Sequence, residues 1–123
     1  MEFNIELRTV VIDCKDAYEL AYFYKKLLGW EFTYEEDNWI LMRNPSGCTG
    51  LSFQSESWYE KPIWPEETGK PTKMIHLDFK VSDLDEAIKH AISCGAEHAP
   101  AQFLDNIHVM IDPAGHPFCL FTD

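Results

Sequence analysis

His76 and Asp78 are the residues of this sequence with the clearest capacity for chemistry. They alternate with apolar residues in the pattern of a β-strand, namely Ile75, Leu77, Phe79 and Val81. Because strand side chains alternate between two faces, we expect the apolar set to lie under a helix and His76 and Asp78 to share the opposite face. A neighbouring carboxylate tunes an imidazole, so the pair is a candidate catalytic general base that needs no metal. The alternative is a histidine that only hydrogen-bonds to a neighbour.

A duplication in the sequence indicates which elements position this pair. The stretch Asp105–Gly115 repeats Asp37–Gly47, with Asp, Asn, Met, Pro and Gly at identical places and an offset of 68 residues. Similar stretches also begin at Asp16 and Asp83, at an offset of 67 residues. Two echoes in the same order at nearly one offset predict a duplicated unit, each copy running strand, helix and three strands.

The periodicity of apolar residues gives the expected elements. Each of the two helices begins after an aspartate, Asp16 or Asp83, that is followed three residues later by a glutamate, which is the pattern of a capping box. Strands are predicted at residues 5–14, 30–35, 39–43, 50–55, 75–81, 97–101, 106–112 and 117–122. These elements form one α+β domain over 1–123, with a first module at about 4–55, a linker at 56–73 and a second module at about 74–123. One helix leaves one face of each sheet uncovered, and two such faces can enclose a concave cup.

Composition limits the classes of function. A length of 123 residues with 46% hydrophobic residues is enough for one domain with a real core. The net charge of −11 argues against binding to nucleic acid or to an anionic membrane surface. The sequence contains neither a signal peptide nor a membrane span by its pattern. The four cysteines are scattered without a CxxC pair, which favours buried thiols in a reducing cytoplasm.

Residues 56–73 interrupt the repeat and hold a cluster of aromatic residues. Trp58, Tyr59 and Trp64 occur there among charges and the prolines 62, 65 and 71. This segment must connect the two modules. Its aromatic side chains could cover a pocket or bury against a partner subunit, and the alternative is a linker that merely packs down.

The chain resembles the glyoxalase/bleomycin-resistance/dioxygenase superfamily, also called the vicinal oxygen chelate proteins. The resemblance is carried by Asp16 with Phe23-Tyr24 and Leu28-Gly29-Trp30, by His76-Leu-Asp with Asp83, and by Asp112-Pro-Ala-Gly-His-Pro-Phe. It runs from about the first strand to the last. The stretch from Trp58 to Pro65 further resembles the glyoxalase-like branch of the superfamily.

The resemblance implies four metal-ligand positions, two in each repeat. In metal-dependent members, His, Gln or Glu at these positions hold a divalent ion that acts as a Lewis acid. Carried onto this sequence, the positions fall on Thr9, Ser52, His76 and Cys119. Because His76 alone matches the family pattern, the expectation is that this chain lacks the usual site of zinc, manganese, nickel or iron. An improvised site from His76 and Cys119 with Asp78 or Gln54 is the alternative.

Three functions from different classes follow. The first is binding of a small organic molecule in the cup, with a candidate lining of Thr9, Ser52, Gln54, Trp58, Tyr59, Trp64, His76, Cys119 and Phe121. The second is a lyase, isomerase or dioxygenase of the chelate type, metal-dependent or metal-free, with His76 and Asp78 as catalytic residues. The third is a structural or regulatory dimer. The resemblance also implies a homodimer, and exposed strand edges make such pairing reasonable.

Overall fold

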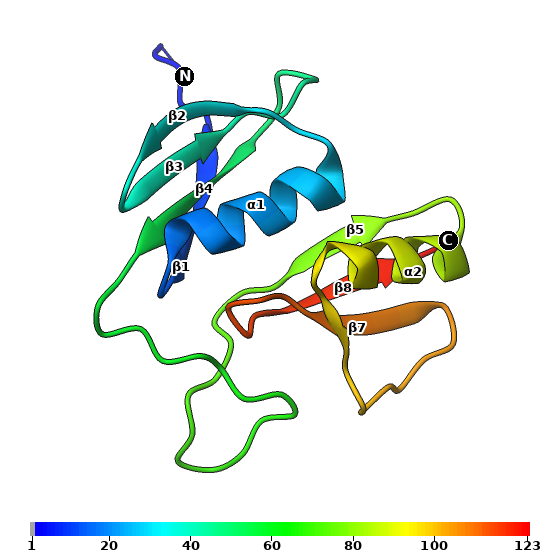
Figure 1. Cartoon of the computed structure of the whole chain (residues 1–123). Helices are drawn as coiled ribbons and strands as arrows, with labels where there is room; N and C mark the ends of the chain where they lie inside the picture. The colour runs from blue at the N-terminus through cyan, green and yellow to red at the C-terminus, as the bar shows by residue number, and fades with distance from the viewer. Residues whose placement is uncertain (1) are drawn as a thin grey trace. The chain divides into compact units, whose positions relative to one another are not determined.

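The computed structural model describes residues 2–123 and divides the chain into two compact units (Figure 1). The first unit ends at Tyr59, and the second begins at Glu60. Each unit contains one helix and one four-stranded sheet. The predicted α+β fold of two tandem βαβββ modules is therefore confirmed, whereas the cup that would join their open faces stays a prediction.

The first unit follows the βαβββ order. Its elements are β1 (Thr9–Cys14), α1 (Ala17–Leu28), β2 (Phe32–Glu36), β3 (Trp39–Met42) and β4 (Gly50–Ser55). The strand order in the sheet is β1-β4-β3-β2, with β1 parallel to β4 and the other neighbours antiparallel. The helix therefore serves as the crossover that lets the first strand lie parallel to the last.

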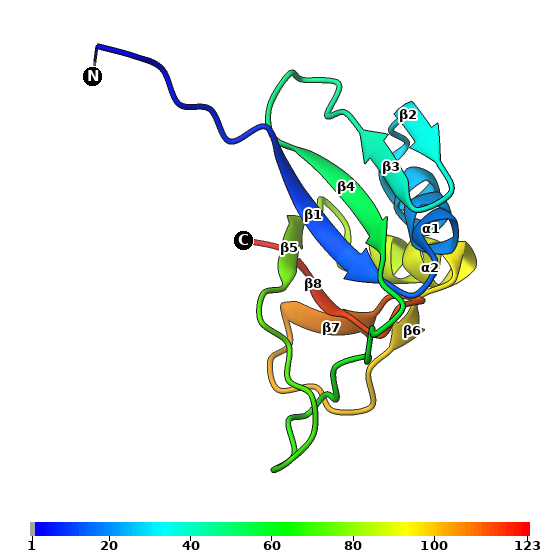
Figure 2. The same ribbon diagram turned by 90° about the vertical axis from the view of Figure 1, so that its left-hand side faces the viewer.

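The second unit repeats this topology. Its elements are β5 (Leu77–Lys80), α2 (Leu84–Cys94), β6 (Glu97–His98), β7 (Ile107–Ile111) and β8 (Pro117–Phe121). The order is β5-β8-β7-β6, with β5 parallel to β8 (Figure 2). Each strand thus occupies the place of its counterpart in the first sheet.

The repeated sequence motif encodes the same turn in both units. The side-chain oxygen of Asn44 accepts a hydrogen bond from the N–H of Ser46 at 3.0 Å, and that of Asp112 accepts one from Ala114 at 2.9 Å. The glycine three residues later has a positive φ in each copy, 84° at Gly47 and 91° at Gly115. These are turns in which an Asn or Asp side chain mimics the backbone and glycine supplies the left-handed residue. They place β4 and β8 beside β3 and β7.

Helix caps and buried faces fix one side of each sheet. The Asp16 side chain accepts hydrogen bonds from two N–H groups in the first turn of α1, and Asp83 accepts one in α2. Helix α1 packs against β1, β3 and β4, whereas α2 packs chiefly against β6 and β8. The buried apolar residues of these faces are Ile12, Leu20, Phe23, Tyr24, Ile40, Met42, Leu51 and Phe53 in the first unit, and Ala91, Met110, Phe118 and Leu120 in the second. Alternation leaves the intervening strand residues on the opposite, open face.

Two predicted strands are shorter than expected. The strand predicted at 5–14 begins at Thr9, because β4 offers no partner before Gly50, and Ile5 and Leu7 are 73% and 67% exposed. The strand predicted at 75–81 spans only Leu77–Lys80, and Ile75 is exposed. The expectation that this strand lies under the helix was therefore wrong in part: β5 is an edge strand whose Leu77 and Phe79 are half-buried.

Candidate functional site

The open face of the first sheet brings two of the four carried-over positions together. Thr9 on β1 and Ser52 on β4 share a hydrogen bond of 2.7 Å between their hydroxyl groups. The register explains this contact, because Thr9 lies beside Gly50 and Val11 beside Ser52 on neighbouring parallel strands. Ser52 is buried and Thr9 half-buried. The two side chains therefore form a polar pair on the open face of the sheet.

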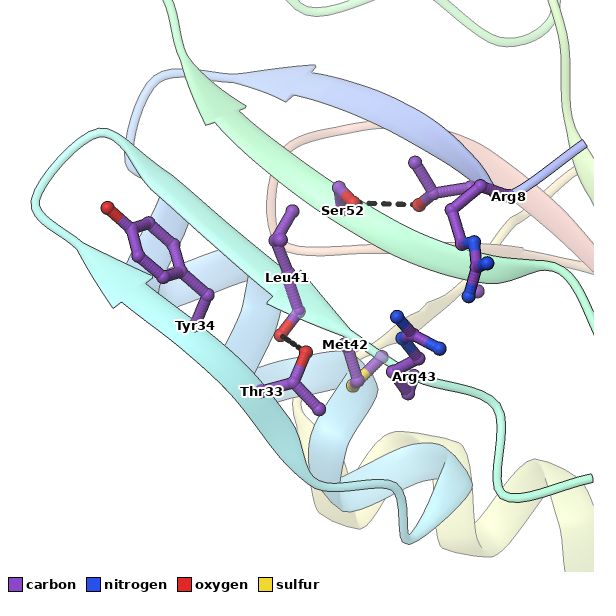
Figure 3. Close-up of a pocket in the computed structure, with 9 residues that line it drawn as sticks. Arg8, Thr33, Tyr34, Leu41, Met42, Arg43 and Ser52 are labelled. Carbon is purple, nitrogen blue, oxygen red and sulfur yellow. Dashed lines mark hydrogen bonds between the residues drawn. The ribbon is translucent and has the colours of Figure 1, made fainter. Parts of the chain in front are cut away.

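A pocket of about 590 Å³ lies on this face (Figure 3). Thr9 and Ser52 line it together with Arg8, Thr33, Tyr34, Leu41, Met42, Arg43 and Gly50. Tyr34 and Leu41 supply aromatic and aliphatic surface, and the Thr33 hydroxyl is turned aside to donate a 3.4 Å hydrogen bond to the Leu41 carbonyl. The volume falls in the ordinary range for small-molecule sites.

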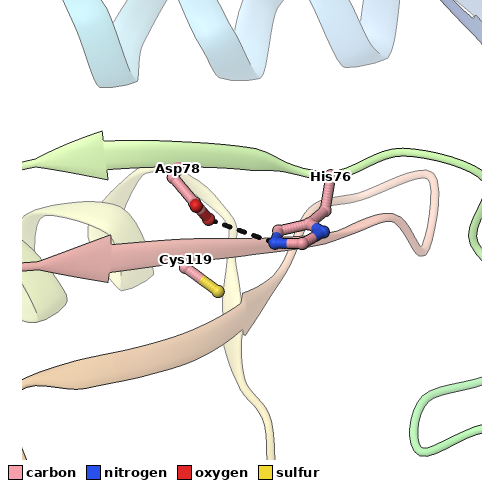
Figure 4. Close-up of side chains that lie close together, drawn as sticks. All are labelled: His76, Asp78 and Cys119. Atoms are coloured by element: carbon pink, nitrogen blue, oxygen red, sulfur yellow. Dashed lines mark ion pairs between the residues drawn. The ribbon is translucent and has the colours of Figure 1, made fainter.

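The second unit gathers His76, Asp78 and Cys119 (Figure 4). Nε2 of His76 lies 3.2 Å from Oδ1 of Asp78, and Cys119 on β8 is the direct cross-strand partner of Asp78. The ligand atoms of all three lie within 4.8 Å of one another. His76 and Asp78 are exposed and Cys119 is half-buried, so this group is open to solvent.

The protonation of Cys119 limits what this group can do. Burial, the negative charge of Asp78 and a hydrogen bond to Asp78 raise the pKa of the thiol from 9.0 to about 11, and the positive charge of Lys73 opposes the rise. The side chain is therefore a neutral thiol at physiological pH. Because the thiolate is the nucleophile and the metal ligand, Cys119 is poorly prepared for either role.

Residues 60–73 belong to the second unit. The N–H of Ile63 donates to the carbonyl of Pro71 at 2.9 Å, which closes this segment into a loop. The Trp64 ring contacts Phe103 edge-to-face at 6.2 Å, and Nζ of Lys73 lies 4.4 Å from its centre. Nε1 of Trp64 is buried and has no hydrogen-bond partner among residues 2–123. Lys73 links this loop to the Cys119 group through its ion pair with Glu66 and its field at the thiol.

The remaining predicted lining residues lie in different places. Trp58 is 91% exposed at the end of the first unit, and Tyr59 beside it is half-buried. Gln54 is half-buried on the open face of the first sheet, where it pairs in register with Asp13. Phe121 is half-buried and follows Cys119 on the open face of β8. Trp58 thus contributes nothing to the first unit's pocket, and Gln54 is not among its lining residues.

Sequence reasoning missed Arg8, Arg43 and Tyr34 as lining residues. The two arginines are the only ones in the sequence, and that scarcity was the signal available for finding them. The sequence predicts that Tyr34 lies in a strand but does not indicate which face of the sheet it occupies. In the structure the register between β2 and β3 shifts at Phe32 and Tyr34, so simple alternation does not apply there.

The four carried-over positions do not fit the metal of the superfamily. Two of them, Thr9 and Ser52, are neutral hydroxyls that satisfy each other, and Cys119 is a protonated thiol. Only His76 has the donor expected for such an ion. Two of these positions, His76 and Cys119, form a three-donor group with Asp78, and this group could hold a metal ion because its donor atoms lie within 4.8 Å of one another.

The topology, with two tandem βαβββ units and an open face on each sheet, defines the class of glyoxalase and bleomycin-resistance folds. A family model described as glyoxalase-like domain matches residues 9–121, so the chain belongs to the glyoxalase-like domain family. No curated protein matches the sequence significantly.

Solved structures share the fold over nearly the whole chain. A glyoxalase/bleomycin resistance protein/dioxygenase family enzyme from Burkholderia phytofirmans PsJN is 20% identical with a TM-score of 0.72, covering 96% of this chain and 98% of its own. A glyoxalase family protein from Enterococcus faecalis is 24% identical with a TM-score of 0.69, covering 98% and 99%. TnmS3, an antibiotic binding protein from Streptomyces sp. CB03234, is 15% identical with a TM-score of 0.63, covering 99% and 98%. At these identities the similarity is one of fold.

Proposed function

We propose that this protein binds a small organic molecule on the open face of its first sheet and that binding needs no divalent ion. The observation that carries the proposal is the pocket of about 590 Å³ lined by Thr9, Ser52, Tyr34 and Leu41. A few polar groups against apolar and aromatic walls are typical of small-molecule sites, in which the apolar surface supplies affinity and the polar groups fix orientation. The hydroxyl pair of Thr9 and Ser52 can donate and accept hydrogen bonds but offers no charged donor to a metal.

The comparisons support binding as a use of this fold. TnmS3 is described as an antibiotic binding protein, and it has the same architecture without close sequence similarity. A shared fold does not transfer a function, so the support for this chain comes from its own pocket. The glyoxalase-like family name, for the same reason, does not assign an activity.

The proposal is tested by mapping ligands onto the protein. Protein treated with a chelator is screened against neutral and charged aromatic compounds, and amide chemical shifts are recorded. We expect hits to move the signals of Thr9, Leu41 and Ser52, which line the pocket. If hits move only signals of the second unit, or if no compound moves any signal, the proposed site is wrong.

A matched pair of tyrosines sharpens this test. Tyr34 lines the pocket and is 45% exposed, whereas Tyr22 on α1 is outside the pocket and 44% exposed. Because an aromatic ring buries a large area against a flat ligand, Tyr34→Ala is expected to weaken binding about tenfold. Tyr22→Ala should leave the affinity unchanged. Equal effects of the two substitutions would count against the pocket.

Catalysis at the second unit is the second candidate function. The observation that favours it is the contact of 3.2 Å between His76 and Asp78 beside Cys119. A carboxylate can orient the imidazole as a general base, and the three donors together could hold zinc in an improvised site. The test is zinc titration of wild type, Cys119→Ala and His76→Ala. Binding of one equivalent that both substitutions abolish would support this function, and no uptake would remove its metal-dependent form.

The assembly and location complete the proposal. Each sheet ends in edge strands, β1 and β2 in the first unit and β5 and β6 in the second, and homodimer formation is a common way to protect such edges. All four cysteines are free thiols, which is consistent with a reducing compartment such as the cytoplasm. Within residues 2–123, no helix has the length and apolar character needed to cross a membrane.

A further inference from the structure

We infer that the ligand of the first unit's pocket carries an anionic group, a carboxylate or a phosphate, and that this group binds between Arg8 and Arg43. The inference rests on the proposed function, because it names the chemical class of ligand for the same pocket. It assigns to two arginines a role in specificity that the fold does not require, since both side chains are exposed.

The position of the two arginines favours an anion-binding site. The sequence contains only two arginines among 123 residues, and both line this one pocket. They lie 35 positions apart in the sequence, one immediately before β1 and one immediately after β3. The other residues counted as positively charged at pH 7 are lysines. Arginine is the residue best suited to planar, two-pronged recognition of a carboxylate or phosphate.

The strand order of the sheet explains why both arginines line one pocket. The N–H of Gly50, the first residue of β4, donates to the carbonyl of Arg8 at 3.0 Å. On the other side, a Cβ built on Gly50 would lie 3.5 Å from Cα of Arg43 and 2.5 Å from the carbonyl oxygen of Met42. Strand β4 therefore lies between the two arginine-bearing segments, and glycine at its first position lets the backbone at the end of β3 approach closely.

The charges around the two arginines also favour a bound anion. The Arg8 and Arg43 guanidinium groups point toward one another (Figure 3). Arg8 forms an exposed ion pair of 3.3 Å with Glu6, and Arg43 has no ion pair among residues 2–123. A bound anion would give Arg43 an ionic partner and would add to the partner that Arg8 already has. Because the whole chain carries a charge of −11, these groups form a local positive site and not part of a basic surface.

The rest of the pocket describes the body of the ligand. Tyr34, Leu41 and Ser52 lie farther along the same face (Figure 3), and the hydroxyl of Ser52 is hydrogen-bonded to that of Thr9. A flat apolar group can pack on the tyrosine ring and the leucine side chain while its acidic end reaches the arginines. The expected ligand class is therefore a small aromatic or hydrophobic acid.

The scarcity of arginine makes the experiment simple, because the side-chain Nε–Hε region of a ¹⁵N spectrum should contain only two signals. The probes are phenyl phosphate, phenylacetate and the neutral analogue phenylacetamide. We expect both anions to shift both arginine signals and the amides of Thr9, Leu41 and Ser52. The preferred anion should bind about tenfold more tightly than phenylacetamide, as hydrogen bonds to charged groups would give. Comparison of phenyl phosphate with phenylacetate decides between phosphate and carboxylate.

Substitutions separate a built site from general charge effects. Arg43→Gln should lower the affinity for the anions to that for phenylacetamide. Lys89→Gln removes one positive charge from the exposed face of α2, outside the pocket, and should change nothing. Glu6→Gln frees Arg8 from its ion pair and should strengthen anion binding about twofold.

Three outcomes would overturn the inference. Equal affinities for phenylacetate, phenyl phosphate and phenylacetamide would leave the pocket standing but refute the anionic ligand. Arginine shifts without shifts at Thr9, Leu41 or Ser52 would indicate surface ion pairing only. If no probe and no other screened compound perturbs these amides, the proposed function fails and the inference fails with it.

Discussion

Asp78 sets the chemistry of its neighbours in the second unit. It contacts the imidazole of His76 at 3.2 Å and lies directly across from Cys119 on the next strand. Its negative charge and its hydrogen bond both hold the proton on the thiol, in addition to the effect of burial. One carboxylate thus orients a potential base and suppresses a potential nucleophile. This arrangement favours a neutral thiol and a partly exposed imidazole over a preformed metal centre.

The thiol of Cys119 should therefore react slowly with alkylating reagents. With a pKa of about 11, the thiolate is a minor species below that pH and grows as the pH rises toward it. Asp78→Asn removes the charge, so we expect the pKa to fall and alkylation by iodoacetamide at pH 9 to become severalfold faster. Mass spectrometry of the cysteine peptides measures the rate. The exposed Cys48 is the internal control and should not change.

An unchanged Cys119 rate in Asp78→Asn would show that burial alone controls the thiol. The raised pKa of Cys119 also makes the stability of the folded state depend on pH. A thiol whose pKa is raised in the folded state contributes stability below its ordinary pKa of 9.0, and this contribution is lost as the pH rises toward 11.

At the residue scale, local sequence predicted some contacts and could not predict others. His76 and Asp78 share a face because they are two residues apart on one extended stretch, which alternation alone indicates. Arg8 and Arg43 line one pocket because β4 lies between their segments in a particular register. This arrangement depends on strand order and register, which no local pattern in either arginine's neighbourhood specifies.

The turn elements explain why the two halves of the sequence resemble each other. Asp112 is buried, and one of its side-chain oxygens accepts hydrogen bonds from the N–H groups of Ala114 at 2.9 Å and His116 at 3.0 Å. The equivalent Asn44 accepts from Ser46 and sits in a more open turn. The repeat was visible in the sequence because a turn of this kind accepts few residue types.

Asp112→Ala should destabilise the protein by about 1–3 kcal/mol, because it leaves the N–H groups of the half-buried Ala114 and His116 without their acceptor. Asp112→Asn keeps a side-chain oxygen and should cost less. Urea unfolding measures both. Equal stability of wild type and Asp112→Ala would mean that the backbone turn holds without the side chain.

A second element is held by one side chain that sequence analysis did not single out. The amide nitrogen of Gln102 donates to the carbonyls of Ala99 at 2.8 Å and Val109 at 2.7 Å, and its oxygen accepts from the N–H of Val109 at 2.8 Å. Gln102 thereby ties residues 99–102 to β7, beyond the two-residue strand β6. This explains why the strand predicted at 97–101 is only Glu97–His98: side-chain bonds replace part of the ladder.

Gln102→Ala should therefore cost about 1–3 kcal/mol, and Gln102→Glu should not restore it, because a carboxylate cannot donate to the two carbonyls. Urea unfolding again measures the change, and hydrogen exchange at Val109 shows whether the loss is local. Wild-type protection of Val109 in Gln102→Ala would contradict this role.

The order of helices and strands in the whole chain could be predicted from the sequence, whereas most residues of the pocket could not. Two offsets of 67 and 68 residues fixed the duplication, and binary patterning with helix caps fixed the order of elements. The four carried-over ligand positions stay a prediction, because they rest on the resemblance to the superfamily. At two of these positions, Thr9 and Ser52, the structure has hydroxyl groups that share a hydrogen bond. A pocket lined by residues of all four strands of one sheet could not be predicted from sequence patterns.

The edges of the two sheets predict a homodimer. Edge strands at both ends of each sheet leave backbone groups available for pairing with a second copy. Sedimentation analysis is expected to give a mass of about twice that of the 14.3 kDa chain at micromolar concentration. A monomer at these concentrations would rule out a stable homodimer.

We expect ligand binding to be independent of divalent ions, and one titration tests this expectation. The best ligand from the screen is titrated into protein whose metal content has been measured, then into chelator-treated protein, and then after one equivalent of zinc, manganese, nickel or iron. We expect the same dissociation constant in every case, with shifts at Thr9 and Ser52. Loss of binding after chelation, restored by one of these ions and abolished in His76→Ala, would contradict it.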